Sequence, residues 1–197
     1  MHLRVLANLP GINDTMPPIS GASRRIFEAN IRTPQQLHEH INDINTLLSA
    51  SQVSLTSSIQ KSTCAKRVGQ LHLVSETLSQ AFKADCARLG LMIWHPDVEQ
   101  SPDCLWNDAH RLVFLRTFKA AMIAREYDWI PALNPDRLKD PLLMLKLYNH
   151  TVHHLWANKT LKERAGPGSM AKKRARETAG KRRSRVRTAL RHRLLLI

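Results

Sequence analysis

The residues best suited to chemistry are the lysines and arginines that crowd the C-terminal part of the chain. From Lys159 to the end lie 14 of the 30 Lys and Arg but only two of the 16 acids, so the preceding part carries 16 bases and 14 acids. The formal net charge of +14 is therefore concentrated in the tail of a nearly neutral protein. This asymmetry predicts a polyanionic partner, namely a nucleic acid, an anionic membrane surface or an acidic protein.

Eleven of these cations are the predicted contacts with nucleic acid. Basic side chains at this density neutralise phosphates and release counterions, which gives salt-sensitive binding without sequence preference. The pattern specifies no base contact, so both DNA and RNA stay open as ligands. The predicted contacts are Lys172, Lys173, Arg174, Arg176, Lys181, Arg182, Arg183, Arg185, Arg187, Arg191 and Arg193.

The tail also allows other interpretations. Lys173-Arg174-Ala175-Arg176 fits the short basic pattern of nuclear import signals, so we expect a nuclear protein, with the cytoplasm or the mitochondrion as alternatives. A protein-interaction or scaffolding module with the tail as an import signal or assembly helix is the alternative function. A solvated tail without a dedicated ligand is a third interpretation. Helical spacing of Val186, Ala189, Leu190, Leu194 and Ile197 predicts an amphipathic helix, which also suits a membrane interface or a helix-binding groove.

Histidines and cysteines supply the other candidate ligands. His150, His153 and His154 share a predicted helix face, so two of them could reach one metal ion. Neighbouring Tyr148, Val152 and Trp156 favour a mixed, partly buried face instead, and no Cys or acid nearby in sequence completes a site. A second, more widely spaced set of two cysteines and two histidines has no recognised zinc spacing. We therefore assign no metal ligands and no cofactor; the looser set is Cys86, His95, Cys104 and His110.

Motifs typical of enzymes are missing from the sequence. There is no Gly-rich phosphate loop, no GxSxG elbow and no CxxC, so we assign no catalytic residue and disfavour an enzyme without excluding one. The three cysteines are odd in number and widely spaced, which predicts a reducing compartment. No apolar run reaches the ~18 residues of a membrane-spanning helix. The sequence does not predict the oligomeric state.

The elements that must position these residues are predicted to be helices. Thr33 before Pro34, with Gln36 three residues later, forms the capping-box pattern with proline in the first turn. The apolar stripe that follows is Leu37, Ile41, Ile44 and Leu48. Ahead of it we predict a short helix over 22–30. Four tryptophans at helix ends and in loops would suit a partner surface, although core packing is their commoner use; they are Trp94, Trp106, Trp129 and Trp156.

Three further helices are predicted downstream. One runs from Ile59 to Leu89 and stops at Gly90. The next covers 102–126, with Ser101 as its cap and Pro102 in its first turn. The last opens at Asp140-Pro141, and the apolar residues on one of its faces are Leu145, Tyr148, Val152, Leu155 and Trp156.

The expected architecture is all-α, an irregular bundle of about four or five helices with a basic C-terminal helical tail. Gly166-Pro167-Gly168 cannot continue a helix cheaply and marks the main boundary. We expect an irregular arm over 1–22, a helical domain over 23–164, a hinge over 165–169 and the basic amphipathic tail over 170–197.

The tripeptide His95-Pro96-Asp97 resembles the His-Pro-Asp of J-domain co-chaperones, which also lies in a loop between two helices. The preceding segment, Ala87 to Trp94, lacks the basic cluster of that family. Proline and aspartate explain a turn by themselves, so we interpret this segment as a loop.

Two segments resemble a family of basidiomycete fungal proteins, in which a helical region is likewise followed by a Lys/Arg-rich stretch. The resemblance covers roughly residues 95–195 and implies no activity, cofactor or site residue. The segments that carry it are Leu105-Trp106-Asn107-Asp108-Ala109-His110-Arg111-Leu112, continuing to Leu115-Arg116-Thr117-Phe118, and Tyr148-Asn149-His150-Thr151-Val152-His153.

Overall fold

The computed structural model describes residues 19, 21–54, 75–125, 136 and 140–194. Over these residues the protein is all-α, as the sequence predicts, and the only extended pairing among them is an isolated parallel bridge between Ser54 and Ile93. No helix within the described ranges combines the length and apolar character needed to span a bilayer.

The first part of the fold consists of two short helices and a 3-10 turn, followed by a longer helix. Helix α2 spans Gly21–Asn30 and α3 spans Pro34–Asn42. A single 3-10 turn, η1, covers Ala50–Gln52, and α4 covers Glu76–Arg88. Helices α3 and α4 contact each other, and η1 packs against α4.

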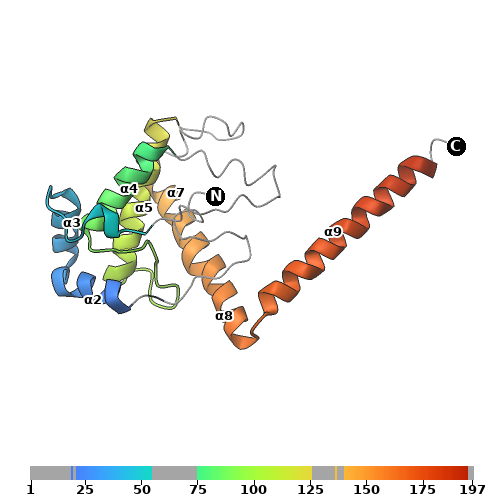
Figure 1. Cartoon of the computed structure of the whole chain (residues 1–197), viewed down its shortest axis with the longest axis horizontal. Helices are drawn as coiled ribbons and strands as arrows, with labels where there is room; N and C mark the ends of the chain where they lie inside the picture. Colours follow the sequence, from blue (N-terminus) through green and yellow to red (C-terminus); the bar gives the residue numbers. More distant parts are fainter. Residues whose placement is uncertain (1–18, 20, 55–74, 126–135, 137–139, 195–197) are drawn as a thin grey trace.

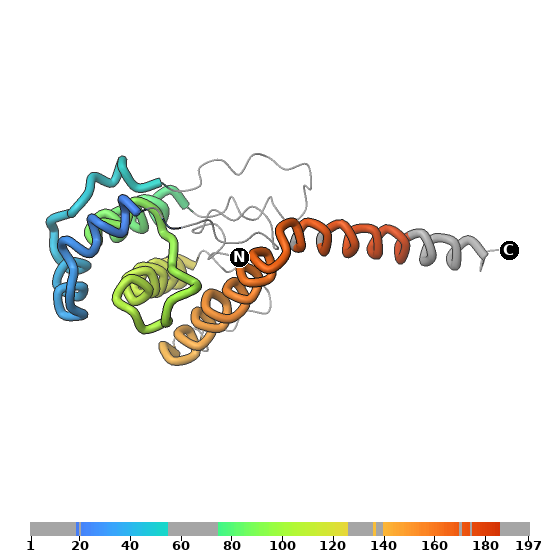
Figure 2. Tube along the Cα trace, turned by 90° about the horizontal axis from the view of Figure 1, so that it is seen from below, coloured from blue at the N-terminus to red at the C-terminus, as the bar shows by residue number. Residues whose placement is uncertain are grey.

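The second part is built on long helices. Helix α5 runs over Leu105–Ile123 and packs against α4. Helix α7, Pro141–Asn149, passes without a break into the π-helical segment η3, His150–Trp156, and then into α8, Ala157–Ala165. Helix α9 occupies Ser169–Leu194, and Figures 1 and 2 show it extending away from the other helices.

Local capping explains where several helices begin. The Thr33 side chain accepts a hydrogen bond from the Gln36 backbone N–H at 3.1 Å, which confirms the predicted start of α3. The Asp140 carboxylate accepts from the backbone N–H groups of Leu142 and Leu143, which confirms the start of α7. At the C-terminal end of α4, Gly90 adopts φ +68°, the left-handed conformation expected of a helix-terminating glycine.

Other predicted bounds are wrong. Helix α4 begins at Glu76, because Ser75 has an extended conformation and caps it through a bond from the Leu78 N–H. The part of the predicted helix before residue 75 lies outside the described residues. Helix α5 begins at Leu105 rather than 102, because Ser101 bonds the Asp103 N–H in a turn that is not continued.

Two residues predicted to face the core are exposed. Ile44 follows the end of α3, so the helical spacing no longer applies to it, and 90% of its surface is exposed. Leu155 lies in η3, where the π-helical turn shifts the register away from that of an α-helix, and 42% of its surface is exposed.

Trp94 occupies the centre of the core. Its ring centroid lies 6.4 Å from the ring centroids of Phe114, Tyr148 and Trp156. One side chain therefore packs against residues of α5, α7 and η3. Its indole N–H donates to the His110 backbone carbonyl at 2.8 Å, which satisfies the polar atom of a fully buried ring. The described tryptophans are therefore used for packing; Trp129 lies outside the described residues.

The segment between α4 and α5 is fixed by one buried amide. The Asn107 carbonyl oxygen accepts from the Asp97 backbone N–H at 2.7 Å, and its NH₂ donates to the backbone carbonyls of Asp97 and Ser101. These bonds satisfy backbone groups that have no helical partner. The loop that contains His95-Pro96-Asp97 is consequently part of the interior, and His95 itself is buried.

Candidate functional site

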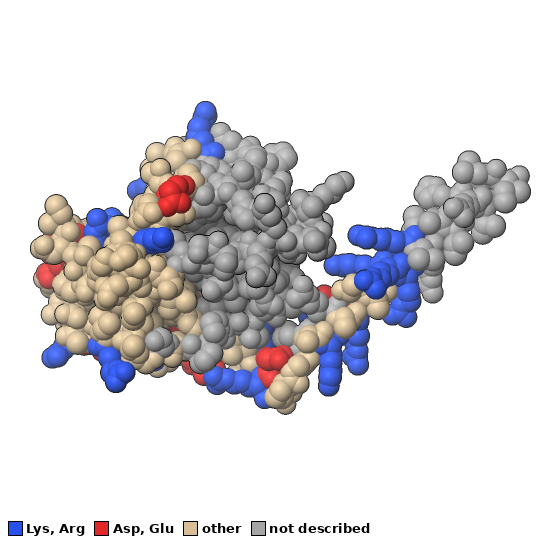
Figure 3. Space-filling view, in the orientation of Figure 1, with Lys and Arg blue, Asp and Glu red and all other residues tan. Residues whose placement is uncertain are grey.

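The basic helix α9 presents its cations on an exposed surface. The described side chains among the predicted contacts are all exposed, and Figure 3 shows Lys and Arg gathered along this helix. They are Lys172, Lys173, Arg176, Lys181, Arg182, Arg183 and Arg185. The side chains of the other four, Arg174, Arg187, Arg191 and Arg193, lie outside the described residues, although their backbone belongs to α9.

The charges surround the helix rather than following one face. An α-helix turns by about 100° per residue, so Lys172, Lys173, Lys181 and Arg182 start from four different sides of the rod. Between residues 171 and 185 no apolar residue larger than alanine interrupts this distribution. The apolar positions that predict an amphipathic face lie at 186–197, where side chains are not described.

The acid on α9 offsets little of this charge. Glu177 is the one acidic residue of the helix, and its carboxylate lies 4.0 Å from the Lys173 ammonium group. Both side chains are about half exposed, and an ion pair of this length in water contributes little to stability. The cations therefore stay available to an external anion.

A polar joint connects α9 to α8. The Glu163 carboxylate accepts from the Gly168 backbone N–H at 2.6 Å and from the Ser169 hydroxyl at 3.1 Å. Gly168 has φ +81°, which a residue with a side chain would adopt only at a cost. Sequence reasoning missed this role of Glu163.

The three clustered histidines separate into a pair and a single residue. His150 and His154 lie together, with ring centroids 5.1 Å apart and both side chains exposed. His153 instead lies against Tyr148, five positions earlier, with ring centroids 6.0 Å apart. Burial lowers the pKa of His153, and neither of its ring nitrogens has a hydrogen-bond partner. The predicted common face for all three is wrong, because η3 is π-helical.

The looser cysteine and histidine set does not form a site among the described residues. Cys86 is fully buried, and burial raises the pKa of its thiol. His110 is also buried, and its Nδ1–H donates to the Trp106 carbonyl at 2.8 Å. Within the described ranges no three His, Cys, Asp or Glu side chains gather closely enough to hold a metal ion.

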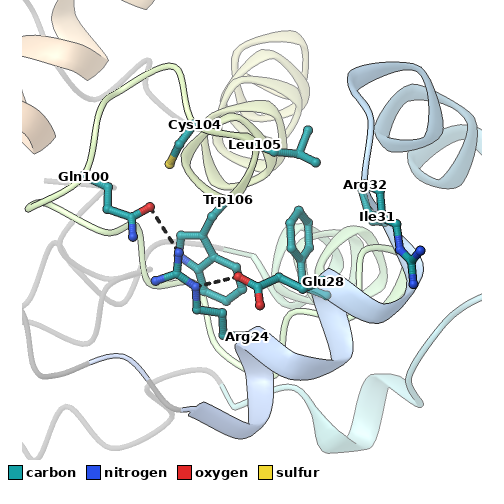
Figure 4. A pocket seen from close by; sticks show the side chains of 9 residues that line it. Arg24, Glu28, Ile31, Arg32, Gln100, Cys104, Leu105 and Trp106 are labelled. Atoms are coloured by element: carbon teal, nitrogen blue, oxygen red, sulfur yellow. Dashed lines mark hydrogen bonds and ion pairs between the residues drawn. The ribbon is translucent and has the colours of Figure 1, made fainter.

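A pocket between α2 and α5 was missed by sequence reasoning. Its volume is about 320 Å³, and Figure 4 shows the Arg24 side chain against the ring of Trp106, with Gln100 and Glu28 on either side of its guanidinium group. The Arg24 guanidinium bonds Glu28 at 2.8 Å and Asp97 at 3.2 Å, and it lies 5.9 Å from the centre of the Trp106 ring. Two carboxylates thus already neutralise this cation, which makes the pocket a weak anion site.

No protein-family model, curated protein or solved structure matches this chain. The likeness to basidiomycete fungal proteins therefore stays a prediction.

Proposed function

We propose that this protein binds nucleic acid without sequence preference, through phosphate contacts made by the basic residues of α9. The other helices would form an irregular bundle that carries α9 as a basic tail. The observation that carries the proposal is the exposed, all-round distribution of cations on one helix that extends away from a nearly neutral body. Each phosphate neutralised in this way releases a counterion, which supplies the binding free energy.

The dimensions of α9 suit such a ligand. A helix of 26 residues is about 39 Å long. Its diameter with side chains, about 10–12 Å, is close to the ~12 Å width of the major groove of B-form DNA. Cations on all sides of the rod would reach phosphates on both strands that border the groove.

The direct test is a fluorescence titration of random duplex DNA and of single-stranded RNA at two salt concentrations. We expect tight, salt-sensitive binding by the full chain and its loss in a chain that ends at Ala165. Absence of binding by the intact chain at low salt would contradict the proposal.

A pair of charge-matched variants separates α9 from general basicity. Replacing Lys181 and Arg182 by Gln should weaken binding and lower the slope of log affinity against log salt by about 0.9 for each lost phosphate contact. Replacing Arg32 and Lys119, two exposed cations of the body, removes the same charge and should change the slope little. Equal effects of the two variants would count against α9 as the contact surface.

Nuclear localisation is proposed together with this function. The motif Lys173-Arg174-Ala175-Arg176 lies near the start of α9, and its described cations are exposed. A fluorescent fusion of the full chain should accumulate in nuclei, whereas a fusion with this motif changed to alanine should not.

Exposed leucines on the long α7–α8 rod favour a second candidate function, a protein-interaction module. Their exposed fractions range from 42% to 64%, which is high for large apolar side chains. Binding through them should tolerate salt and weaken when they are changed to alanine, the opposite of phosphate binding. They are Leu142, Leu147, Leu155 and Leu161.

A further inference from the structure

Two exposed imidazoles lie one helical turn apart on the π-helical segment. The rings of His150 and His154 have their centroids 5.1 Å apart, and the angle between their planes is 21°. Both side chains are exposed, so solvent and solutes reach their ring nitrogens. This arrangement lies on the long α7–α8 rod and is separate from the cations of α9.

We propose that His150 and His154 form a two-histidine chelate for a divalent transition-metal ion, with Cu²⁺ bound more tightly than Zn²⁺. Neutral imidazole is a ligand suited to copper, nickel and zinc. The order of affinity follows from the general preference of nitrogen ligands for Cu²⁺ over Zn²⁺.

The spacing of the rings matches this chemistry. Zinc–nitrogen bonds are about 2.0–2.1 Å long, so two imidazoles on one tetrahedral ion have their ring centroids about 5 Å apart. The observed 5.1 Å therefore needs only a rotation of the rings to aim both nitrogens at one ion. The described residues offer no third His, Cys, Asp or Glu in reach, so water completes the coordination.

A neighbouring amide can orient one of the two ligands. The Asn158 amide nitrogen lies 3.4 Å from Nδ1 of His154. A flip of this amide places its oxygen there, where it accepts the Nδ1–H and leaves Nε2 free to bind the ion. Metal-bound histidines commonly have their second nitrogen held in this way.

His153 supplies a matched internal control. It lies on the same segment and is the same residue type, but its ring faces Tyr148 and is half-buried. Changing His153 therefore tests whether metal affinity depends on the positions of His150 and His154, or whether any of the ten histidines of the chain contributes equally.

The test is a titration of the full-length protein with CuCl₂, and separately with ZnCl₂, in competition with a chromogenic chelator. We expect one tight ion per chain. Affinity should fall by about tenfold or more in His154→Ala and in His150→Ala, because one imidazole alone loses the benefit of intramolecular chelation. His153→Ala should bind as the wild type does.

The double variant distinguishes a chelate from independent sites. Changing both His150 and His154 should weaken binding little more than either single change, since each alone already removes the bidentate site. Additive losses, or wild-type affinity in both single variants, would overturn the proposal. Because both side chains are exposed, the variants should keep the wild-type circular dichroism and thermal midpoint, which shows that any loss is not caused by unfolding.

Discussion

The buried His110 makes the stability of the fold depend on pH. Burial lowers the pKa of His110 to about 3, against 6.5 for an ordinary histidine. Between pH 3 and 6.5 the imidazole of His110 is therefore protonated in the unfolded chain but neutral in the native state. The free energy of unfolding should therefore fall as the pH drops from about 6.5 towards 3, by up to about 1.4 kcal/mol per pH unit.

Urea denaturation at several pH values checks this prediction. His110→Gln removes the titrating group, so it should be less stable at neutral pH but lose less stability on acidification. An unchanged slope in His110→Gln would show that another group dominates; His153, whose pKa burial also lowers, acts in the same direction.

Asp85 connects two arginines at the junction of α3, α4 and α5. Its carboxylate accepts from Arg88 at 2.7 Å and from Arg116 at 3.3 Å, and Arg116 also donates to the Asn42 side chain. Only 10% of the Asp85 side chain is exposed. Because Asp85→Ala leaves two cations without their shared partner, we expect a loss of about 2 kcal/mol in the free energy of unfolding.

The control for Asp85 is an exposed acid in a similar pair. Asp103 contacts Arg111 at 3.4 Å, but 84% of its side chain is exposed. Asp103→Ala should therefore change stability by only a few tenths of a kcal/mol. Comparable losses from the two substitutions in chemical denaturation would argue against a special role for the Asp85 network.

At the scale of elements, Gly90 decides how α4 ends. Its N–H bonds the Ala87 carbonyl and the following Leu91 N–H bonds that of Cys86, which turns the chain into the core segment. A Cβ at this position would lie 3.0 Å from the Ile26 side chain, in a backbone region that L-residues avoid. Gly90→Ala should cost about 1–2 kcal/mol in thermal or urea unfolding.

Gly21→Ala provides the matched comparison. Gly21 is the first residue of α2, and nothing lies within 4 Å of a Cβ built there. We expect this substitution to be neutral or slightly stabilising, because alanine has the higher helix propensity. A large loss at Gly21, or none at Gly90, would contradict the assigned conformations.

At the scale of the whole molecule, the proposed binding of nucleic acid by α9 leads to a prediction of which nucleic acid binds more tightly. No Phe, Trp or Tyr occurs in this helix, so it lacks the large aromatic rings on which the bases of single strands stack. The deep, narrow major groove of A-form RNA also excludes a helix of this width. In competition at fixed salt, we expect duplex DNA to displace the protein from single-stranded RNA of equal charge. Equal or stronger binding of the RNA would contradict this preference.

Much of the local structure was determined by sequence alone. The starts of α3 and α7 follow from Thr33 and Asp140, and the stop of α4 follows from Gly90. Capping depends on residues within about four positions of the helix end, so the local sequence is enough to predict it. The concentration of charge after Lys159 is likewise a property of the sequence.

Tertiary structure decided which residues meet across or along the elements. The sequence does not indicate that Asp85 joins two arginines, that Asn107 fixes the loop between α4 and α5, or that His153 lies apart from His150 and His154. Burial and hydrogen-bond partners depend on segments far apart in the chain. A π-helical turn changes which spacing shares a face. Trp94, for example, packs against Tyr148 and Trp156, a contact between distant segments that helical periodicity alone cannot predict.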